Sequence, residues 1–229
     1  MAAILCFDFD DTITLENTAR QVFERFAKPE WRDFEAEYHA GSLTVEQFNA
    51  KAFATVEASR EELREFALEV TQPRAGFLEL LDWAQWNDWL TAVVSNGFDF
   101  YVDALFDKLG AQRIARHAAR TRFDYNWRCI YLSPRGIEIE DGFKLSYASA
   151  FLGAGDFVAY IGDGESDITA ARLAPAAFAR DTLWEHLKDE HPRIYPFETF
   201  EDVRSVLERE GPTWLAESEP GEGPSPQSL

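Results

Sequence analysis

Two aspartates stand two residues apart directly after the apolar segment Ile4–Phe7. Side chains at positions i and i+2 of a strand point to the same face, so Asp8 and Asp10 are expected to point the same way while Phe7 and Phe9 pack on the other face. Neighbouring carboxylates raise each other's pKa, which makes them costly as scaffold. The pair therefore predicts either a cation site or a nucleophile beside a proton shuttle.

Polar residues with a chemical role are also expected at the ends of three later elements. These are Ser95, Asn96 and Gly97 after the strand Leu90–Val94, Lys144 in the first turn of the helix Phe143–Leu152, and Asp163 and Asp167 after the strand Phe157–Ile161. Ligands of parallel sheets gather outside the carboxyl ends of the strands. The alternation of strands and helices predicts such a sheet, so these residues are expected to meet Asp8 and Asp10.

A phosphate monoester is the substrate class that this set of residues suggests, provided that its charge is neutralised. A phosphate dianion facing three ionised carboxylates would concentrate about five negative charges, and each close like-charge pair at ~4 Å costs roughly 4 kcal/mol at an effective dielectric constant of about 20. Mg²⁺ bound by Asp8, Asp163 and the main-chain carbonyl of Asp10 would offset this cost. Asp167 is expected either to be a further metal ligand or to orient the metal ligands without contacting the metal itself.

The favoured mechanism gives each residue a separate role. Asp8 attacks phosphorus and forms an aspartyl-phosphate, while Asp10 protonates the leaving alcohol and later takes a proton from water. The hydroxyl of Ser95 and the amides of Asn96 and Gly97, which are expected to begin a helix, hold phosphate oxygens. Lys144 neutralises phosphate charge and restrains Asp8.

The fold predicted from the 229 residues is α/β, with a parallel sheet and helices on both faces. Residues 15–71 have helical periodicity throughout, and the capping boxes Thr44-x-x-Gln47 and Ser59-x-x-Glu62 open two of four predicted short helices. We therefore expect a core of residues 1–14 and 72–210 with an inserted helical module of residues 15–71. The polar residues 211–229 are expected to be disordered.

Composition limits the partners of the chain. Its 41 acidic and 22 basic residues give a formal charge of −19, which disfavours nucleic acids and anionic membrane surfaces. No apolar run approaches the roughly 20 residues of a membrane span, and Cys6 and Cys129 form neither a disulfide framework nor a zinc pattern. A cytoplasmic protein is expected, as a monomer or a homodimer.

Taken together, Asp8-Phe9-Asp10-Asp11-Thr12, Ser95, Lys144 and Gly162–Asp167 resemble the four motifs of the haloacid dehalogenase superfamily, in its phosphoserine-phosphatase-like branch. The resemblance extends to about residue 180. It implies a Rossmann-like core with a helical cap at residues 15–71, and Mg²⁺-dependent hydrolysis of a small phosphorylated metabolite through an aspartyl-phosphate. It also implies that the cap closes over the substrate and expels water.

Shorter segments resemble one group within that branch. Pro29-Glu30-Trp31, Gly76-Phe77, Val93–Phe100 and Phe178–Asp181 are similar to methionine-salvage phosphatases that act on 2-hydroxy-3-keto-5-methylthiopentenyl-1-phosphate, although Asn96 stands where glycine is usual. Phosphoserine phosphatase, or a phosphatase of another small metabolite, is the alternative. For phosphoserine, the resemblance implies a glutamate at the position of Asn17.

Several other residues have two interpretations. The arginines of residues 113–135 either pair with the acidic surface or help to collect an anionic substrate; they are Arg113, Arg116, Arg120, Arg122, Arg128 and Arg135. Four aromatic residues of the helical module are interpreted as its own core rather than a substrate-facing wall: Trp31, Tyr38, Phe48 and Phe53. The four histidines are interpreted as surface residues: His39, His117, His186 and His191.

A phospho-acceptor signalling domain is the rival from another class, because it also combines an aspartate, a hydroxyl residue and a lysine on a parallel sheet. Such a domain has no need of Asp10 or of a helical insertion at residues 15–71. A dehalogenase of the same superfamily is a second rival, but it would not need the carboxylates of Asp163 and Asp167.

Overall fold

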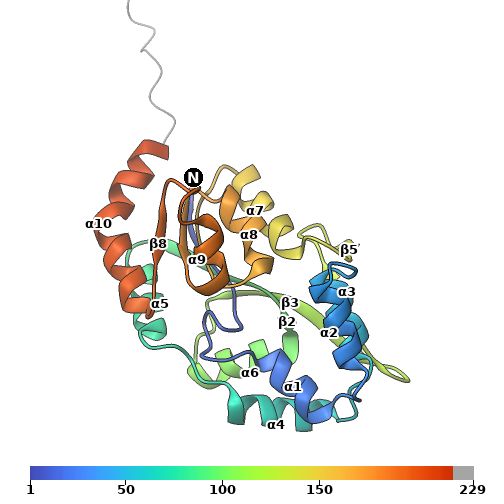
Figure 1. Ribbon diagram of the computed structural model, residues 1–229. Coiled ribbons are helices and arrows are strands. Elements are labelled where there is room, and N and C mark those ends of the chain that lie inside the picture. The colour runs from blue at the N-terminus through green and yellow to red at the C-terminus, as the bar shows by residue number, and fades with distance from the viewer. Residues whose placement is uncertain (219–229) are drawn as a thin grey trace, which may run out of the picture.

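A computed structural model describes residues 1–218 and has an α/β architecture, as predicted (Figure 1). Its strands are β1 (Ala3–Phe7), β2 (Trp89–Phe98), β3 (Ala115–Phe123), β4 (Trp127–Leu132), β5 (Glu138–Ile139), β6 (Phe157–Gly162), β7 (Ala176–Ala179) and β8 (Ile194–Pro196). They form one sheet in the order β5-β4-β3-β2-β1-β6-β7-β8. Strands β1, β2, β3, β6, β7 and β8 run parallel, and β4 and β5 extend the sheet antiparallel at one edge.

Helices cover both faces of this sheet. From residue 77 onward these helices are α5 (Phe77–Trp86), α6 (Asp99–Leu109), α7 (Phe143–Gly153), α8 (Ile168–Leu173), α9 (Asp181–Leu187) and α10 (Phe200–Ser218). Helices α5 and α10 lie together on one side of the sheet and α7 and α8 on the other (Figure 1). No helix within residues 1–218 has both the length and the apolar character to cross a bilayer.

The centre of the sheet is apolar on both faces. Every residue of β1 and of β6 is buried, which is typical of parallel strands covered on both sides. The ring of Phe7 contacts Phe77 of α5 and Phe200 of α10 edge-on. The chain passes from β1 to β2 on one side and reaches β6 on the other, so the order of the sheet reverses at β1. Such a switch point is where α/β sheets bind ligands.

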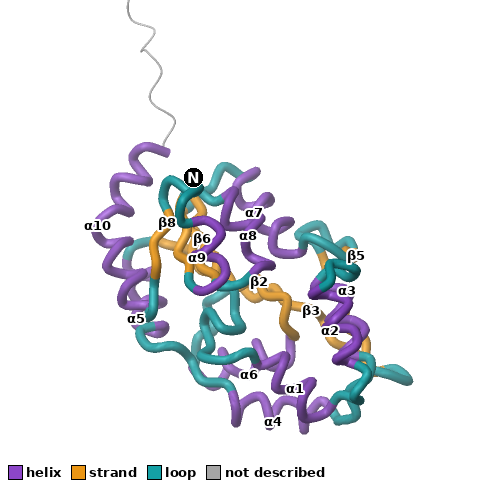
Figure 2. Tube along the Cα trace, viewed as in Figure 1, coloured by secondary structure: helices purple, strands orange, loops and turns teal. Residues whose placement is uncertain are grey.

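Four helices between β1 and α5 form the predicted helical module: α1 (Thr18–Phe26), α2 (Trp31–His39), α3 (Val45–Phe53) and α4 (Arg60–Val70). Both predicted capping boxes are present at the starts of α3 and α4. Figure 2 shows these helices, in purple, at the end of the sheet to which β2 and β3 lead. Within the module, Phe23 packs against Trp31 and Phe48.

The predicted start of the disordered tail at residue 211 is wrong for residues 211–218. Helix α10 continues through Gly211 and Pro212 to Ser218. Trp214 is only 3% exposed, and its ring stacks on Phe157 and lies against Tyr195. Burial of this indole stabilises a segment whose polar composition alone predicts disorder. Residues 219–229 of the predicted tail lie outside the described residues.

Candidate active site

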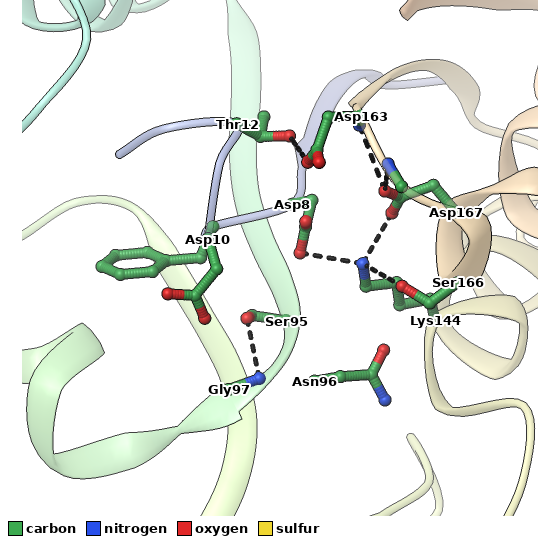
Figure 3. A network of polar contacts seen from close by, with 12 residues as sticks. Asp8, Asp10, Thr12, Ser95, Asn96, Gly97, Lys144, Asp163, Ser166 and Asp167 are labelled. Atoms are coloured by element: carbon green, nitrogen blue, oxygen red, sulfur yellow. Dashed lines mark hydrogen bonds and ion pairs between the residues drawn. The ribbon is translucent and has the colours of Figure 1, made fainter. Parts of the chain in front are cut away.

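The register of the central strands brings the predicted site residues together. Phe7 pairs with Val93 of β2 and with Ile161 of β6. Asp8, the next residue, therefore lies between the ends of both neighbouring strands, and its main-chain N–H donates to the carbonyl of Ile161 over 2.9 Å. Figure 3 shows the resulting group of polar side chains, which come from β2, α7 and the loops after β1 and β6.

Lys144 is the cation at the centre of this group, in the first turn of α7. Its Nζ lies 2.9 Å from Oδ1 of Asp8 and 2.7 Å from Oδ1 of Asp167, and it donates to Oγ of Ser166 over 2.9 Å (Figure 3). Burial alone would lower the pKa of Lys144, but the charges of Asp167 and Asp8 outweigh burial and raise it. Lys144 thus stays protonated, and it contacts one carboxylate oxygen of Asp8.

Asp8 is buried, with 6% of its surface exposed. Burial raises its pKa well above the ordinary value, while the charge of Lys144 opposes that rise. Lys144 binds one carboxylate oxygen, and within residues 1–218 no side chain donates a hydrogen bond to the other oxygen. One oxygen of Asp8 is therefore held and the other is free to react or to bind a cation.

Asp167 is fully buried and has partners at both oxygens. Its Oδ2 accepts from the main-chain N–H groups of Asp163 and Gly164, and its Oδ1 accepts from the hydroxyl of Tyr160. Gly162 is required by this arrangement, because an added Cβ would lie 2.7 Å from Cγ of Asp167. Asp167 therefore fixes Lys144 and the loop after β6 in position.

Asp163 accepts a 2.6 Å hydrogen bond from Oγ1 of Thr12. Burial, together with the nearby charge of Asp167, raises the pKa of Asp163 to about 7. Carboxylate oxygens of Asp8, Asp163 and Asp167 lie within 4.8 Å of one another. Three carboxylates beside the single ammonium of Lys144 leave two negative charges uncompensated, so the charge and donor set fit a hard divalent cation.

Asp10 lies in the same cavity but has a different environment. Its Oδ1 accepts from the main-chain N–H of Thr18 over 2.7 Å, and its Oδ2 accepts from the hydroxyl of Tyr101. Burial raises the pKa of Asp10 to about 6, although both hydrogen bonds lower it. Because Thr18 begins α1, the helical module takes part in fixing the carboxylate of Asp10.

The prediction that Ser95, Asn96 and Gly97 begin a helix is wrong. They belong to β2, which continues to Phe98 before α6 begins at Asp99. The pairing of β2 with β3 shifts register between Val94 and Phe98, so this segment bends out of the regular ladder. All three residues line the cavity, and the N–H of Gly97 donates to Oγ of Ser95 over 2.9 Å.

A cavity of about 280 Å³ lies between these core residues and the helical module. Its core side includes all the predicted site residues except Asp167, which is buried behind it. Its module side includes Arg20, Phe23, Trp31, Tyr38 and Phe48. The cavity is therefore bounded by two parts of the chain that are far apart in sequence.

The module's aromatic residues serve two purposes. Trp31, Tyr38 and Phe48 line the cavity, which differs from their interpretation as core alone. Phe53 is core, since its ring stacks on Phe98 and contacts Trp127. The three side chains at the cavity face both the module's interior and the space above the carboxylates, a double role that helical spacing cannot distinguish.

The arginines of residues 113–135 do not line the cavity. Arg116 instead pairs with Asp103 and Asp107 on the outer side of α6. Within residues 1–218, the arginine that lines the cavity is Arg20, in the first turn of α1, where it pairs with Glu35 over 2.6 Å. This position could not be predicted from the sequence, because a single arginine on an amphipathic helix is normally a surface residue.

Other site residues also went unnoticed in the sequence. His39, interpreted as a surface residue, is exposed but lines the rim of the cavity. Tyr101 contacts Asp10, and the buried Arg74 donates to the carbonyls of Asp11 and Thr12 in the loop after β1. Each of these residues comes from a different segment of the chain. The sequence shows only that each residue is aromatic or basic, and not that it lies at the site.

Comparison with known proteins identifies relatives along most of the chain. The family profile described as haloacid dehalogenase-like hydrolase matches residues 5–172. A 2-hydroxy-3-keto-5-methylthiopentenyl-1-phosphate phosphatase of Bacillus velezensis is 29% identical over 95% of this chain and 95% of its own. A phosphatase of the same name from Bacillus thuringiensis is 30% identical over 87% of this chain and 93% of its own.

Solved structures with the same fold include phosphoserine phosphatases. One described as a phospho-aspartyl intermediate analogue superimposes with a TM-score of 0.66 at 20% identity, over 91% of this chain and 98% of the other. A substrate-bound complex gives a TM-score of 0.65 at 21% identity over the same shares. At this level of identity the likeness concerns the fold, and it agrees with the predicted Rossmann-like arrangement.

Proposed function

The chain belongs to the haloacid dehalogenase-like hydrolases, and we propose that within this family it is a Mg²⁺-dependent phosphatase of small phosphate monoesters. The reaction passes through an aspartyl-phosphate on Asp8. The observation that carries this proposal is the different state of the two aspartates after β1. Asp8 has a free oxygen beside Lys144, whereas both oxygens of Asp10 are held by donors.

The free oxygen of Asp8 attacks phosphorus, and the bond between phosphorus and the leaving-group oxygen breaks. Asp10 supplies the proton to that oxygen; its raised pKa, at about 6, supports a carboxyl that can carry a proton near neutral pH. Asp10 then accepts a proton from the water that attacks the aspartyl-phosphate. Phosphate leaves and Asp8 is regenerated.

Ser95 and Lys144 hold the phosphoryl oxygens during both steps. The hydroxyl of Ser95 can donate to one oxygen, and Nζ of Lys144 contributes its charge from within the buried group. Mg²⁺ bound by Asp8, Asp163 and the main-chain carbonyl of Asp10 would supply the remaining positive charge. Asp167 acts through Lys144 and the loop after β6, because its own oxygens already have partners.

We assign helices α1–α4 as the cap that selects the leaving group. They supply one wall of the cavity, and that wall combines the rings of Phe23, Trp31 and Phe48 with the guanidinium of Arg20. Such a wall suits a leaving group with both an apolar and a polar part. Together with the printed names of the relatives, this supports a methionine-salvage phosphatase acting on 2-hydroxy-3-keto-5-methylthiopentenyl-1-phosphate.

Release of phosphate tests the proposal. We expect the purified protein to hydrolyse p-nitrophenyl phosphate with repeated turnover in Mg²⁺, and to lose activity in EDTA until Mg²⁺ is restored. A panel of phosphorylated metabolites, including 2-hydroxy-3-keto-5-methylthiopentenyl-1-phosphate and phosphoserine, then identifies the leaving group. A single stoichiometric phosphorylation without turnover would instead support a phospho-acceptor domain.

Replacement of the nucleophile provides the residue-level test. Asp8→Asn should reduce turnover by about a thousandfold or more, because an amide cannot attack phosphorus. The exposed Asp189, which does not line the cavity, provides the matched control Asp189→Asn with unchanged activity. Substantial activity in a correctly folded Asp8→Asn protein would refute the assignment.

A further inference from the structure

Helix α3 carries two buried polar side chains where it meets the core. Glu46 is 3% exposed and Asn49 is 5% exposed. Residues three apart lie on the same face of a helix, so both point to the same neighbours. Buried polar groups persist in folded proteins when they have hydrogen-bond partners. The partners of Glu46 and Asn49 all belong to the core, and two of them adjoin residues of the proposed phosphate site.

Glu46 connects two separate segments of the core. Its Oε1 accepts from Nδ2 of Asn96 over 3.0 Å and from the main-chain N–H of Phe143 over 2.9 Å. Asn96 follows Ser95, and Phe143 precedes Lys144. Phe143 is the first residue of α7, where main-chain N–H groups lack intrahelical partners and a carboxylate is favoured by the helix dipole.

Asn49 holds the other side of the same peptide segment. Its Nδ2 donates to the carbonyl of Asn96 over 2.8 Å and to the hydroxyl of Tyr131 over 2.9 Å. The hydroxyl of Tyr131 in turn donates to the carbonyl of Asn96. Both the side chain and the main chain of Asn96 are therefore bound, through residues that are buried in the structure.

We infer that Glu46 and Asn49 are positioning residues, which couple the docking of α3 on the core to the placement of Ser95 and Lys144. When α3 docks, one carboxylate oxygen fixes the segment after Ser95 relative to the start of α7. The phosphate site and the wall of the cavity are thereby completed in the same movement. The catalytic part of this inference rests on the proposed phosphatase function.

Other polar contacts of α3 contribute less to this coupling. The ion pair between Lys51 and Glu37 is nearly half exposed on both sides, and exposed pairs are weak. Lys51 therefore provides a control on the same helix, because it does not line the cavity. A hydrogen bond to a buried charged group is stronger, and its loss corresponds to about a tenfold to hundredfold change in an equilibrium.

Kinetics of three variants on p-nitrophenyl phosphate test the inference. Glu46→Ala should lower kcat/KM by about tenfold or more, whereas Glu46→Gln should stay within about threefold of the unmodified protein, because an amide oxygen can accept both bonds. Lys51→Ala should leave kcat/KM unchanged. Asn49→Leu, which keeps the branched shape of the side chain and removes the donor, gives a second route if Glu46→Ala does not fold.

A double-mutant cycle and hydrogen exchange separate positioning from general destabilisation. The combined loss in Glu46→Ala with Asn96→Ala should be clearly smaller than the product of the single losses, because both remove one interaction. Amide exchange in α3 should accelerate in Glu46→Ala and not in Glu46→Gln. Exchange is measured whether or not the protein is a phosphatase, so failure of the proposed function remains distinguishable.

Any one of four results would overturn the inference. Three of them are a kcat/KM of Glu46→Ala within twofold of the unmodified protein, losses that multiply fully in the cycle, and an exchange rate in α3 that Glu46→Ala does not change. An impairment of Glu46→Gln equal to that of Glu46→Ala would also overturn it, because charge and not the two accepted bonds would then be responsible.

Discussion

At the residue scale, the four aspartates of the site differ in how many of their oxygens have partners. Asp8 has one held oxygen, Asp163 accepts one bond from Thr12, and Asp10 and Asp167 have partners at both oxygens. In the proposed mechanism these differences separate a nucleophile, a metal ligand, a proton carrier and a supporting residue, although all four are the same residue type in the sequence. The proposed role of each aspartate therefore depends on the residues that surround its carboxylate.

Asp10→Asn should separate the two chemical steps. An amide cannot take a proton from water, so steady turnover of p-nitrophenyl phosphate should fall by about a hundredfold or more. Phosphorylation of Asp8 should still occur, because p-nitrophenolate leaves without a proton. Rapid mixing should therefore reveal a burst of about one nitrophenolate per protein. A slow reaction with no burst would argue against a two-step reaction.

Gly97→Ala should disrupt the environment of Asp10 although it replaces no ionisable residue. An added Cβ would lie 1.8 Å from the hydroxyl of Tyr101 and 2.7 Å from Oδ2 of Asp10, so that at least one of them must move. We expect a loss of about tenfold or more in kcat, because displacements near 1 Å have large effects on catalysis. Gly153→Ala is the control, since nothing lies within 4 Å of its added Cβ. Equal activities would contradict this reading of the geometry.

At the element scale, the ends of β2 and α10 are set by tertiary contacts. Strand β2 continues through Ser95–Gly97 because Phe98 pairs again with Ala119 of β3, and Asn49 of α3 binds the carbonyl of Asn96 in between. Helix α10 continues past Gly211 and Pro212 because Trp214 finds an apolar site against Phe157. Both elements extend beyond the points at which their sequences predict that they end.

Trp214→Ala measures what the last turns of α10 contribute. Removal of a buried indole should lower the free energy of unfolding by about 3 to 5 kcal/mol. Trp86→Ala removes the same side chain from an 84% exposed position and should change stability by less than about 0.5 kcal/mol. Chemical denaturation of both variants gives the comparison. A neutral Trp214→Ala would mean that this end of α10 does not stabilise the fold.

At the scale of the whole molecule, the acidic chain concentrates its buried negative charge at one end of the sheet. Burial raises the pKa of Asp10 to about 6 and that of Asp163 to about 7. A carboxyl whose folded pKa is raised favours folding at low pH, and this contribution is lost as the pH rises through the folded pKa. Without a cation, these groups should therefore lower stability progressively between about pH 4 and about pH 7, and the full cost remains at higher pH.

Mg²⁺ should stabilise the protein more at pH 8 than at pH 5. At pH 8 the carboxyls are ionised and can bind the ion, whereas at pH 5 protons compete for them. Saturating Mg²⁺ should raise the melting temperature by about 5 °C or more at pH 8, relative to EDTA, and by much less at pH 5. Asp163→Asn should abolish the difference. A gain that is equal at both pH values would place the ion elsewhere, for example on the acidic surface.

The sequence by itself determined the α/β class, the four helices between β1 and α5, and the candidate residues from Asp8 to Asp167. These features depend on local patterns: apolar runs predict buried strands, helical periodicity and capping boxes predict α1–α4, and polar residues directly after strands predict a ligand site. Their positions along the chain are short-range information. Parallel order then placed them at one end of the sheet.

Only the tertiary structure decided which residues from distant segments complete the site. Tyr101 beside Asp10, Arg20 at the cavity and Glu46 between Asn96 and Phe143 are contacts between elements whose separation in sequence carries no signal. The same holds for the extents of β2 and α10. Packing selects the partners of Asp10 and Glu46, because burial makes each of these polar groups require a donor that the local sequence does not supply.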